Sequence, residues 1–327
     1  MKFGVWIPSY CYPGLDYARV HQEVHDFSRK ANDLGLDLFV IDHLLHAPGL
    51  YGMPWLEPLT VLTYASAVAP DVRVGTGILV LPLRHPVILA KQVATLDFVT
   101  GGRFIFGVGP GWDPREFEAV GHHVSERGAR TDEILAAVRR LLTEENVTFE
   151  GRYYQFRELS IEPRPPKLPE IWVSGGSRLP DPQYTADPPQ LHPSVLRRIL
   201  GSDAWLARNS GTNEWLKRDW AEIRGALRAQ GRPETDVRFH HVNFTYVVDT
   251  DDREKALAIQ RPFFEQVMGN HRSFEHLETC YLMGTPGDIV AKLRDLQEAG
   301  LEYTVIGPTS DDIGQLELIA DRIVSEL

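Results

Sequence analysis

Short apolar segments alternate with longer amphipathic segments along most of the chain. The short segments have the length of buried strands, whereas the longer ones repeat apolar residues at helical spacing. Strands are predicted at Phe3–Ile7, Leu38–Ile41, Val72–Leu81, Phe104–Val108, Ile171–Ser174, Ala204–Ala207, Val242–Val248 and Tyr303–Ile306. Helices are predicted near Asp16–Leu34, Leu59–Val68, Val87–Val99, Thr131–Leu142 and Pro286–Glu298. Eight short strands separated by helices predict a parallel (β/α)8 TIM barrel that forms one domain over residues 1–327.

Two segments depart from this alternation. Val147–Phe149 and Tyr153–Phe156 flank a Glu-Gly-Arg turn, which predicts a hairpin. Ser177–Pro193 contains five prolines and no helical period, which predicts an insertion loop (residues 177–193) above the fifth strand. Active sites of such barrels lie on the loops that follow the strands, so this loop is either a lid or an excursion without function.

Composition and charge exclude several functional classes. The 327 residues are 43% hydrophobic and 10% aromatic, which is typical of a protein that forms a core. The net charge of -11 argues against a nucleic-acid partner. The apolar runs are far shorter than the ~20 residues that a bilayer requires, and the N-terminal segment lacks the pattern of a signal peptide. With Cys11 and Cys280 as the only cysteines, a disulfide framework is excluded. We expect a cytoplasmic enzyme with no membrane partner.

His43 is the titratable side chain that the predicted fold places best for chemistry. It follows the second strand, and a barrel directs that end of the strand to the mouth of the active site. The ring can exchange a proton or donate a hydrogen bond there, although a structural or capping role fits the position equally well. No metal-binding spacing such as HExxH occurs, so no metal site is expected.

Glycine-rich segments lie within one of the predicted strands and at the ends of two others. Gly75-Thr76-Gly77 lies within the third apolar run, where glycine marks a bulge or the close approach of a ligand. Gly107–Gly111 ends the fourth strand, but its spacing is not the GxGxxG of a dinucleotide fold. Ser174-Gly175-Gly176-Ser177 ends the fifth strand, and its backbone amides and hydroxyls suit an anion such as a phosphate. Glycine that serves only tight turns explains each segment as well.

Aromatic residues gather at or near the same strand ends. They can line a flat slot for a ring-shaped cofactor or a substrate, or they can be packing at the rim. The aromatic residues in question are Trp6, Tyr10, Trp55, Trp112 and Trp172, of which we assign Trp6, Tyr10 and Trp55 to a substrate pocket.

These pieces occur in an order that resembles the bacterial luciferase-like superfamily, which contains flavin-dependent monooxygenases and deazaflavin (coenzyme F420) oxidoreductases. The most specific stretch is GGRFIFGVGPGWDPREFEAVG at 101–121, followed by EPRPPKLPEIWVSGGS at 162–177. The matching segments span nearly the whole chain. The resemblance implies a (β/α)8 barrel with its flavin-type cofactor at the carboxyl ends of the strands.

The resemblance also implies roles for individual residues. His43 matches a histidine that lies beside the reactive part of the cofactor ring, and we take it as the catalytic residue. Gly77-Ile78 matches a bulge that often holds a non-proline cis peptide against the ring face. Arg127 or Arg130 can supply a cation near the cofactor's phosphate. The predicted cofactor-binding residues are Thr76, Gly77, Ile78, Gly109, Trp112, Arg127, Ser174, Gly175, Gly176 and Ser177.

Two departures from the family pattern concern the choice of chemistry. Pro110 occupies the place of a phosphate-contacting arginine of the luciferases, and Trp112 that of the catalytic glutamate of a sugar-phosphate dehydrogenase branch. The absence of that carboxylate favours an oxygen-dependent monooxygenase that uses reduced FMN on a small apolar or aromatic substrate. The alternative is an F420-dependent oxidoreductase that transfers hydride. The resemblance further implies a separate flavin or F420 reductase as partner, and a homodimer.

Overall fold

Eight parallel strand positions form a closed barrel in the computed structural model, which describes residues 1–9, 17–46, 54–177, 191–269 and 273–327. The strands follow the order β3-β2-β1-β11-β10-β9-β8-β5-β4, and the pairing of β3 with β5 closes the ring. The predicted TIM barrel is therefore confirmed. The barrel strands are β1 (Lys2–Trp6), β2 (Asp37–Val40), β3 (Val74–Thr76) with β4 (Leu79–Val80), β5 (Phe104–Gly109), β8 (Glu170–Gly175), β9 (Ala204–Ala207), β10 (Arg238–Thr245) and β11 (Leu301–Pro308).

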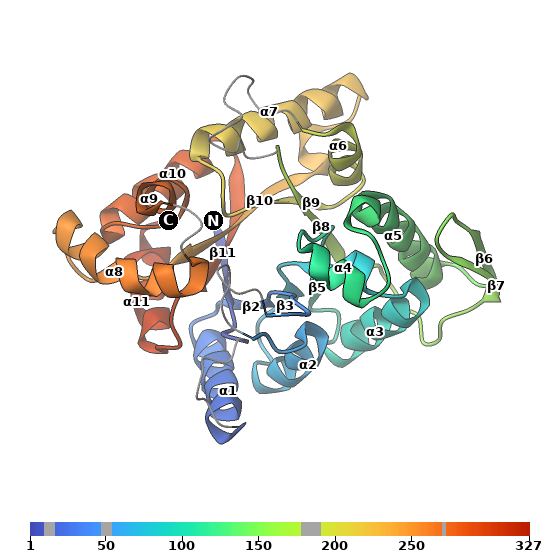
Figure 1. The fold of residues 1–327 in the computed structure, drawn as a ribbon, viewed down its shortest axis with the longest axis horizontal. Coiled ribbons are helices and arrows are strands. Elements are labelled where there is room, and N and C mark those ends of the chain that lie inside the picture. The colour runs from blue at the N-terminus through green and yellow to red at the C-terminus, as the bar shows by residue number, and fades with distance from the viewer. Residues whose placement is uncertain (10–16, 47–53, 178–190, 270–272) are drawn as a thin grey trace.

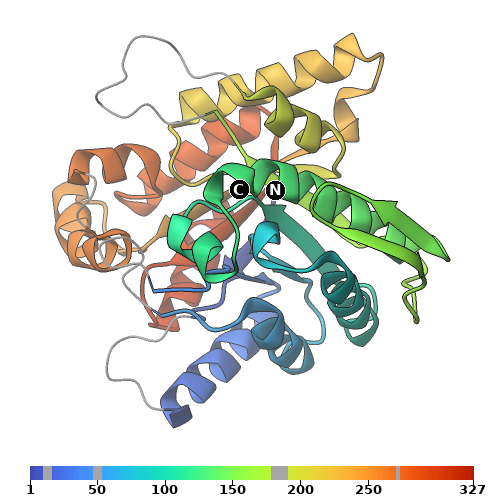
Figure 2. The same ribbon diagram turned by 45° about the vertical axis from the view of Figure 1, so that its right-hand side comes forward.

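Helices surround the barrel, as Figures 1 and 2 show. None of the helices within the described ranges is long and apolar enough to span a membrane. The helices are α1 (Tyr17–Asp33), α2 (Pro58–Val68), α3 (Pro86–Val99), α4 (Pro114–Ala119), α5 (Arg127–Thr143), α6 (Pro193–Leu200), α7 (Asn213–Ala229), α8 (Arg253–Met268), α9 (Phe274–Cys280), α10 (Pro286–Glu298) and α11 (Gly314–Arg322). The described residues also form four short 3-10 turns, namely η1 (Leu81–Leu83), η2 (Val124–Glu126), η3 (Glu234–Asp236) and η4 (Val324–Glu326).

The predicted hairpin is present, and it lies outside the barrel. It consists of β6 (Val147–Glu150) and β7 (Gln155–Leu159), which pair in antiparallel orientation. Both ribbon views show it next to α5, away from the strands of the barrel. Most of the predicted insertion loop, residues 178–190, lies outside the described residues, so its role as a lid stays a prediction.

Two predicted strands differ from those observed. The third apolar run is divided into β3 and β4 by a backbone irregularity at Gly77 and Ile78. The seventh strand was expected at Val242–Val248, but β10 is Arg238–Thr245. The prediction was displaced because Arg238, His240 and His241 interrupt the apolar pattern, although the chain is already in the sheet at those positions.

Side chains alternate between two separate apolar clusters along each strand. Val5, Leu38 and Phe104 belong to the cluster between strands and helices, whereas their neighbours Trp6 and Phe39 belong to a second cluster. This second cluster also contains Ile105, Trp172, Leu206, Phe244, Tyr303 and Val305 from other strands. Because successive side chains of a strand point to opposite faces, the strand residues of the second cluster line the interior of the barrel.

Large aromatic rings fit in this interior because glycine occupies the facing positions. The Phe39 ring is stacked on Trp172 at 5.3 Å between ring centroids. A Cβ atom added to Gly4 would lie 2.6 Å from Phe39 Cε2, and one added to Gly75 would lie 2.6 Å from Phe39 Cε1. Gly307 provides the same space for the ring of Trp6. The interior is therefore filled by a few large rings that leave no room for side chains opposite them.

His241 is fully buried between the barrel and its helices, on the same side of β10 as Phe239. Neither ring nitrogen has a hydrogen-bond partner among the described residues. Burial lowers the pKa of His241 from 6.5 to about 3, because the charged form is poorly solvated there.

We expect Gly4→Ala to lower the free energy of unfolding by about 1–3 kcal/mol, because the added methyl group forces Phe39 out of its position. Urea denaturation measures the change. Gly225→Ala in α7 is the matched control, since its Cβ would meet only Arg228 Nη2 at 3.8 Å. That substitution should leave stability unchanged or raise it by about 0.5–1 kcal/mol. An equal effect of the two substitutions would contradict the account of the barrel interior.

The buried His241 should make the protein less stable in acid. The pKa of His241 is 6.5 in the unfolded chain and about 3 in the folded protein, so only the unfolded chain binds this proton between these values. The free energy of unfolding therefore falls as the pH drops from 6.5 towards 3. Replacement by Leu removes the effect together with an unsatisfied polar group. We expect His241→Leu to be more stable than wild type by about 1–3 kcal/mol near neutral pH. The difference should grow by about 2 kcal/mol near pH 5, at about 1.4 kcal/mol per pH unit. Urea denaturation at both pH values tests this, and a constant difference would refute it.

Candidate active site

The carboxyl ends of β2, β3, β5 and β8 place the predicted site residues at one mouth of the barrel. His43 follows β2, Ile78 precedes β4, Gly109 ends β5, and Ser174 and Gly175 end β8. Most residues in the middle of these strands are buried, whereas Ile78, Ser174, Gly175 and Gly176 are partly exposed. The partial exposure marks this mouth as a surface on which a ligand can rest.

A buried carboxylate on α4 fixes the segment that carries His43. Glu116, only 1% exposed, accepts hydrogen bonds from the backbone amides of Leu44 at 2.7 Å and Leu45 at 3.1 Å. The same oxygen lies 3.4 Å from Nδ1 of His43. Asp113 caps α4 by accepting from the Arg115 amide, which holds the helix start in place. Glu116 therefore couples the loop after β5 to the end of β2.

Glu116 lies within the most specific stretch, 101–121, but no pattern in the sequence marks it as a site residue. Its signal was weak because a single acidic residue in a short helix usually faces solvent. Only the fold shows that α4 turns this carboxylate towards the loop after β2.

A second buried carboxylate joins β2 to β4. Asp42, which precedes His43, accepts hydrogen bonds from the Val80 amide at 2.8 Å and from Arg84 Nη2 at 2.8 Å. Burial raises the pKa of Asp42, and the Arg84 guanidinium and the Val80 amide oppose that rise. Arg84 was also missed, because it lies 42 positions along the chain from Asp42.

Two tryptophans flank the His43 ring. Its centroid lies 5.4 Å from that of Trp55 and 5.9 Å from that of Trp112, which is 45% exposed. The structure thus brings together His43, Trp55 and Trp112. Tyr10, the third aromatic residue predicted for a substrate pocket besides Trp6 and Trp55, lies outside the described residues.

Trp6 lies beneath the backbone irregularity that follows β3. Its ring is buried, 5% exposed, and Nε1 donates to the Gly77 carbonyl at 3.1 Å. A cis peptide bond joins Gly77 to Ile78, at the position that the family resemblance implied. The hydroxyl of Thr76 donates to the Gly107 carbonyl at 2.6 Å. These contacts place Trp6 and Thr76 under the exposed surface, where they support Gly77 and Ile78.

Gly109 leaves space for Ile78. A Cβ atom on Gly109 would lie 2.7 Å from Ile78 Cδ1 and 3.6 Å from the Ser174 Cβ. Ile78, Gly109 and Ser174 therefore adjoin one another across β4, β5 and β8.

The loop after β8 is held by residues that the sequence analysis did not name. Ser177 is buried, and its amide donates to Asp219 Oδ2 at 2.8 Å. Burial raises the pKa of Asp219, whereas the hydrogen bonds from Ser177 oppose this rise. A Cβ on Gly176 would lie 3.1 Å from Asp219 Oδ2 and 3.5 Å from Arg208 Nε. A cation and a carboxylate from the next two elements thus reach the predicted phosphate loop.

Arg127 is exposed and begins α5, where its Nη1 donates to the Val124 carbonyl at 2.9 Å. This hydrogen bond directs the Arg127 guanidinium to the turn before α5. Arg130, the alternative, pairs with Glu126 at 2.9 Å and lies over the Tyr153 ring. Arg208 is the cation that the structure brings to this loop.

Comparison with known proteins identifies the family. The FMNH(2)-dependent dimethylsulfone monooxygenase of Pseudomonas fluorescens (strain Pf0-1) is 28% identical over 271 residues, which cover 80% of this chain and 68% of that protein. The F420-dependent glucose-6-phosphate dehydrogenase of Intrasporangium calvum is 27% identical over 324 residues, 89% of this chain and 90% of that one. The crystal structure of the monooxygenase RslO1 from Streptomyces bottropensis shares the fold, with a TM-score of 0.77, 23% identity and 99% coverage of both chains. The family described as luciferase-like monooxygenase matches residues 1–180. The chain therefore belongs to the luciferase-like monooxygenase family.

Proposed function

We propose that this protein is a monooxygenase that uses reduced FMN and molecular oxygen to oxidise a small apolar or aromatic substrate. The observation that carries the proposal is the position of the His43 ring between Trp55 and Trp112, at 5.4 and 5.9 Å. Two indole rings beside one titratable ring make an apolar surrounding in which water is displaced from the reacting atoms. Trp112 also occupies the place of the glutamate that the sugar-phosphate branch of the family uses.

The residues at the barrel mouth fit a flavin. Ile78 is a partly exposed apolar side chain that packs over the buried Gly109, and it offers an apolar contact for the face of a planar ring. Gly175, Gly176 and Ser174 lie at the end of β8, where Arg208 supplies a positive charge for a phosphate. When it is bound, the reduced flavin supplies the electrons that activate oxygen.

His43 and Glu116 act on proton position in this proposal. A proton on Nδ1 is directed at the Glu116 carboxylate, which leaves Nε2 as the nitrogen that exchanges a proton with the substrate or cofactor. Glu116 also accepts the Leu44 and Leu45 amides, so the same carboxylate orients both the ring and its backbone. Trp55 and Trp112 restrict water on either side of the ring.

The second candidate is an F420-dependent oxidoreductase that transfers hydride to or from an organic substrate. It is supported by the match to the F420-dependent glucose-6-phosphate dehydrogenase, which covers 89% of this chain. In that case His43 would serve as the proton donor or acceptor for the substrate. A separate reductase that supplies the reduced cofactor belongs to both proposals. So do a homodimer and a cytoplasmic location, which light scattering and cell fractionation check.

Anaerobic titration of the purified protein separates the two candidates. We expect reduced FMN to bind more tightly than reduced F420 by about tenfold or more, and the bound FMN to be reoxidised when oxygen is added. Fluorescence and absorbance follow the two steps. Preferential binding of F420, with slow reaction towards oxygen, would replace the monooxygenase proposal by the hydride-transfer candidate.

Glu116→Gln tests the role of the buried carboxylate. The amide oxygen can still accept from the Leu44 and Leu45 amides, but the charge beside His43 is lost. We expect kcat to fall by about tenfold to a hundredfold, as for other partners that orient a functional histidine, with little change in cofactor affinity.

Glu118→Gln is the matched control, since Glu118 lies on the same helix and is exposed. The rate of reduced-cofactor oxidation at saturating substrate and the affinity for the cofactor are the readouts for both variants. Equal kcat and equal cofactor affinity in Glu116→Gln and Glu118→Gln would show that Glu116 has no part in orienting His43.

A further inference from the structure

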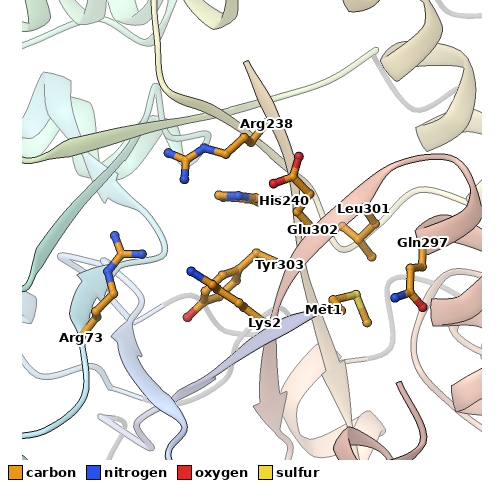
Figure 3. A pocket seen from close by; sticks show the side chains of 9 residues that line it. All are labelled: Met1, Lys2, Arg73, Arg238, His240, Gln297, Leu301, Glu302 and Tyr303. Carbon is orange, nitrogen blue, oxygen red and sulfur yellow. The ribbon is translucent and has the colours of Figure 1, made fainter. Parts of the chain in front are cut away.

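A cavity of about 420 Å³ lies at the opposite end of the barrel from His43, where the amino ends of the strands meet. Figure 3 shows its lining side chains. This basal cavity is lined by Met1, Lys2, Arg73, Arg238, His240, Gln297, Leu301, Glu302 and Tyr303. Its volume falls in the range of small-molecule sites, about 300–1,000 Å³.

Three cationic side chains meet at the basal cavity, although the protein as a whole carries a net charge of -11. Glu170 bridges two of them, lying 2.5 Å from Arg73 Nη2 and 2.6 Å from Arg238 Nη2. Each guanidinium has five N–H groups, so both arginines keep donors beyond those that Glu170 uses. Lys2 forms no ion pair within the described part of the chain. The bridge fixes the two arginines in position and neutralises only one of their charges.

Three carboxylates, Glu170, Glu302 and Asp37, lie around the three cations, but none of them forms an ion pair with Lys2 within the described part of the chain. Glu302 is exposed and lines one side. Asp37 lies behind Tyr303, accepts its hydroxyl at 2.6 Å and accepts the Arg73 amide at 2.8 Å, so its oxygens are directed into the wall. The side chains that line the cavity therefore comprise three cations and one carboxylate.

His240 is the buried polar group that faces these cations. The residue is 2% exposed, and its ring centroid lies 4.3 Å from that of Trp172 and 5.3 Å from that of Tyr303. These two rings separate the cavity from the barrel interior. Nδ1 is buried without a hydrogen-bond partner among the described residues. Figure 3 shows the charged ends of Arg73, Arg238 and Lys2 on one side of this ring.

The electrostatic surroundings of His240 agree with a cationic cavity. Burial first, and then the charges of Arg238, Arg73 and Lys2, hold the pKa of His240 well below its usual value. The ring is therefore neutral near pH 7, with one N–H to donate. Because Nδ1 is enclosed by the protein, an anion in the cavity would accept its hydrogen bond from Nε2, beside the unpaired charge of Lys2.

We propose that the basal cavity binds the phosphate group of a small metabolite, held by Arg73, Arg238 and Lys2 and by a hydrogen bond from His240. Planar guanidinium groups match the oxygens of a phosphate, and a cavity of about 420 Å³ leaves space for the organic part. The site is separate from the barrel mouth that carries His43, and it does not depend on the cofactor assigned there.

Calorimetric titration of the purified protein with inorganic phosphate, at constant ionic strength, tests the proposal. We expect saturable binding whose dissociation constant rises about tenfold in Lys2→Gln, the loss expected for one charged hydrogen bond. His240→Phe keeps a ring against Trp172 and Tyr303 but removes both nitrogens, and should weaken binding similarly. Arg157→Gln removes an equal charge from the exposed hairpin and should change nothing.

Phosphate that binds with the same affinity to Lys2→Gln would belong to another site, such as the loop after β8, and would overturn the proposal. Binding of citrate with no binding of phosphate would overturn the assignment to a phosphate group, and so would the absence of any saturable heat. Lys2 is exposed at the start of β1, so its variant should fold and decides the question even if His240→Phe does not.

Discussion

The packing of Phe39 against two glycine backbones is the contact on which the interior of this barrel depends. Its ring occupies the space opposite Gly4 and Gly75, and it stacks on Trp172 while meeting Tyr303 edge-on. Five strands, β1, β2, β3, β8 and β11, are thereby held at distances set by one large side chain. His43 and the Gly77–Ile78 segment lie at the carboxyl ends of β2 and β3. The packing of Phe39 therefore also sets the distance between them. Trp6 continues the arrangement upward, because its indole supports the Gly77 carbonyl.

At the mouth of the barrel, buried carboxylates fix the segments that follow the strands. Glu116 holds the backbone after β2 from α4, and Asp42 holds β4 from the end of β2. Asp219 does the same for Ser177 after β8. Each carboxylate accepts a backbone amide from another segment at the barrel mouth, so that segment has lost conformational freedom before any ligand arrives. A site assembled in this way meets a planar cofactor with little rearrangement.

The sequence was sufficient to predict the elements that repeat and the residues that end strands. Short-range patterns predict the eight strands, the hairpin and the position of His43 after the second strand. The family resemblance implies the cis peptide bond between Gly77 and Ile78. The structure contains each of these features. Glu116, Arg84, Asp219 and Arg208 could not be found in the same way. Each meets its partner from a distant part of the chain, and a single charged residue has no periodicity that reveals its partner.

The displaced prediction for the seventh strand has a related cause. Arg238 and His240 belong to β10 yet are polar, because they face the basal cavity. A pattern that identifies strands by apolar residues passes over such positions. Errors in strand boundaries can therefore coincide with polar cavities inside a barrel.

The division of the third barrel strand into β3 and β4 has a consequence for how this sequence can change. β3 pairs with β5 at Val74 and Gly75, and β4 pairs with it again at Leu79 and Val80. Between these two ladders, the Thr76 hydroxyl donates a hydrogen bond to the Gly107 carbonyl. Any Cβ atom at residue 107 would collide with the Thr76 carbonyl. A side-chain hydroxyl thus stands in for a backbone donor at the seam. Substitutions at positions 76 and 107 are therefore coupled, since neither residue can be replaced freely while the other is unchanged.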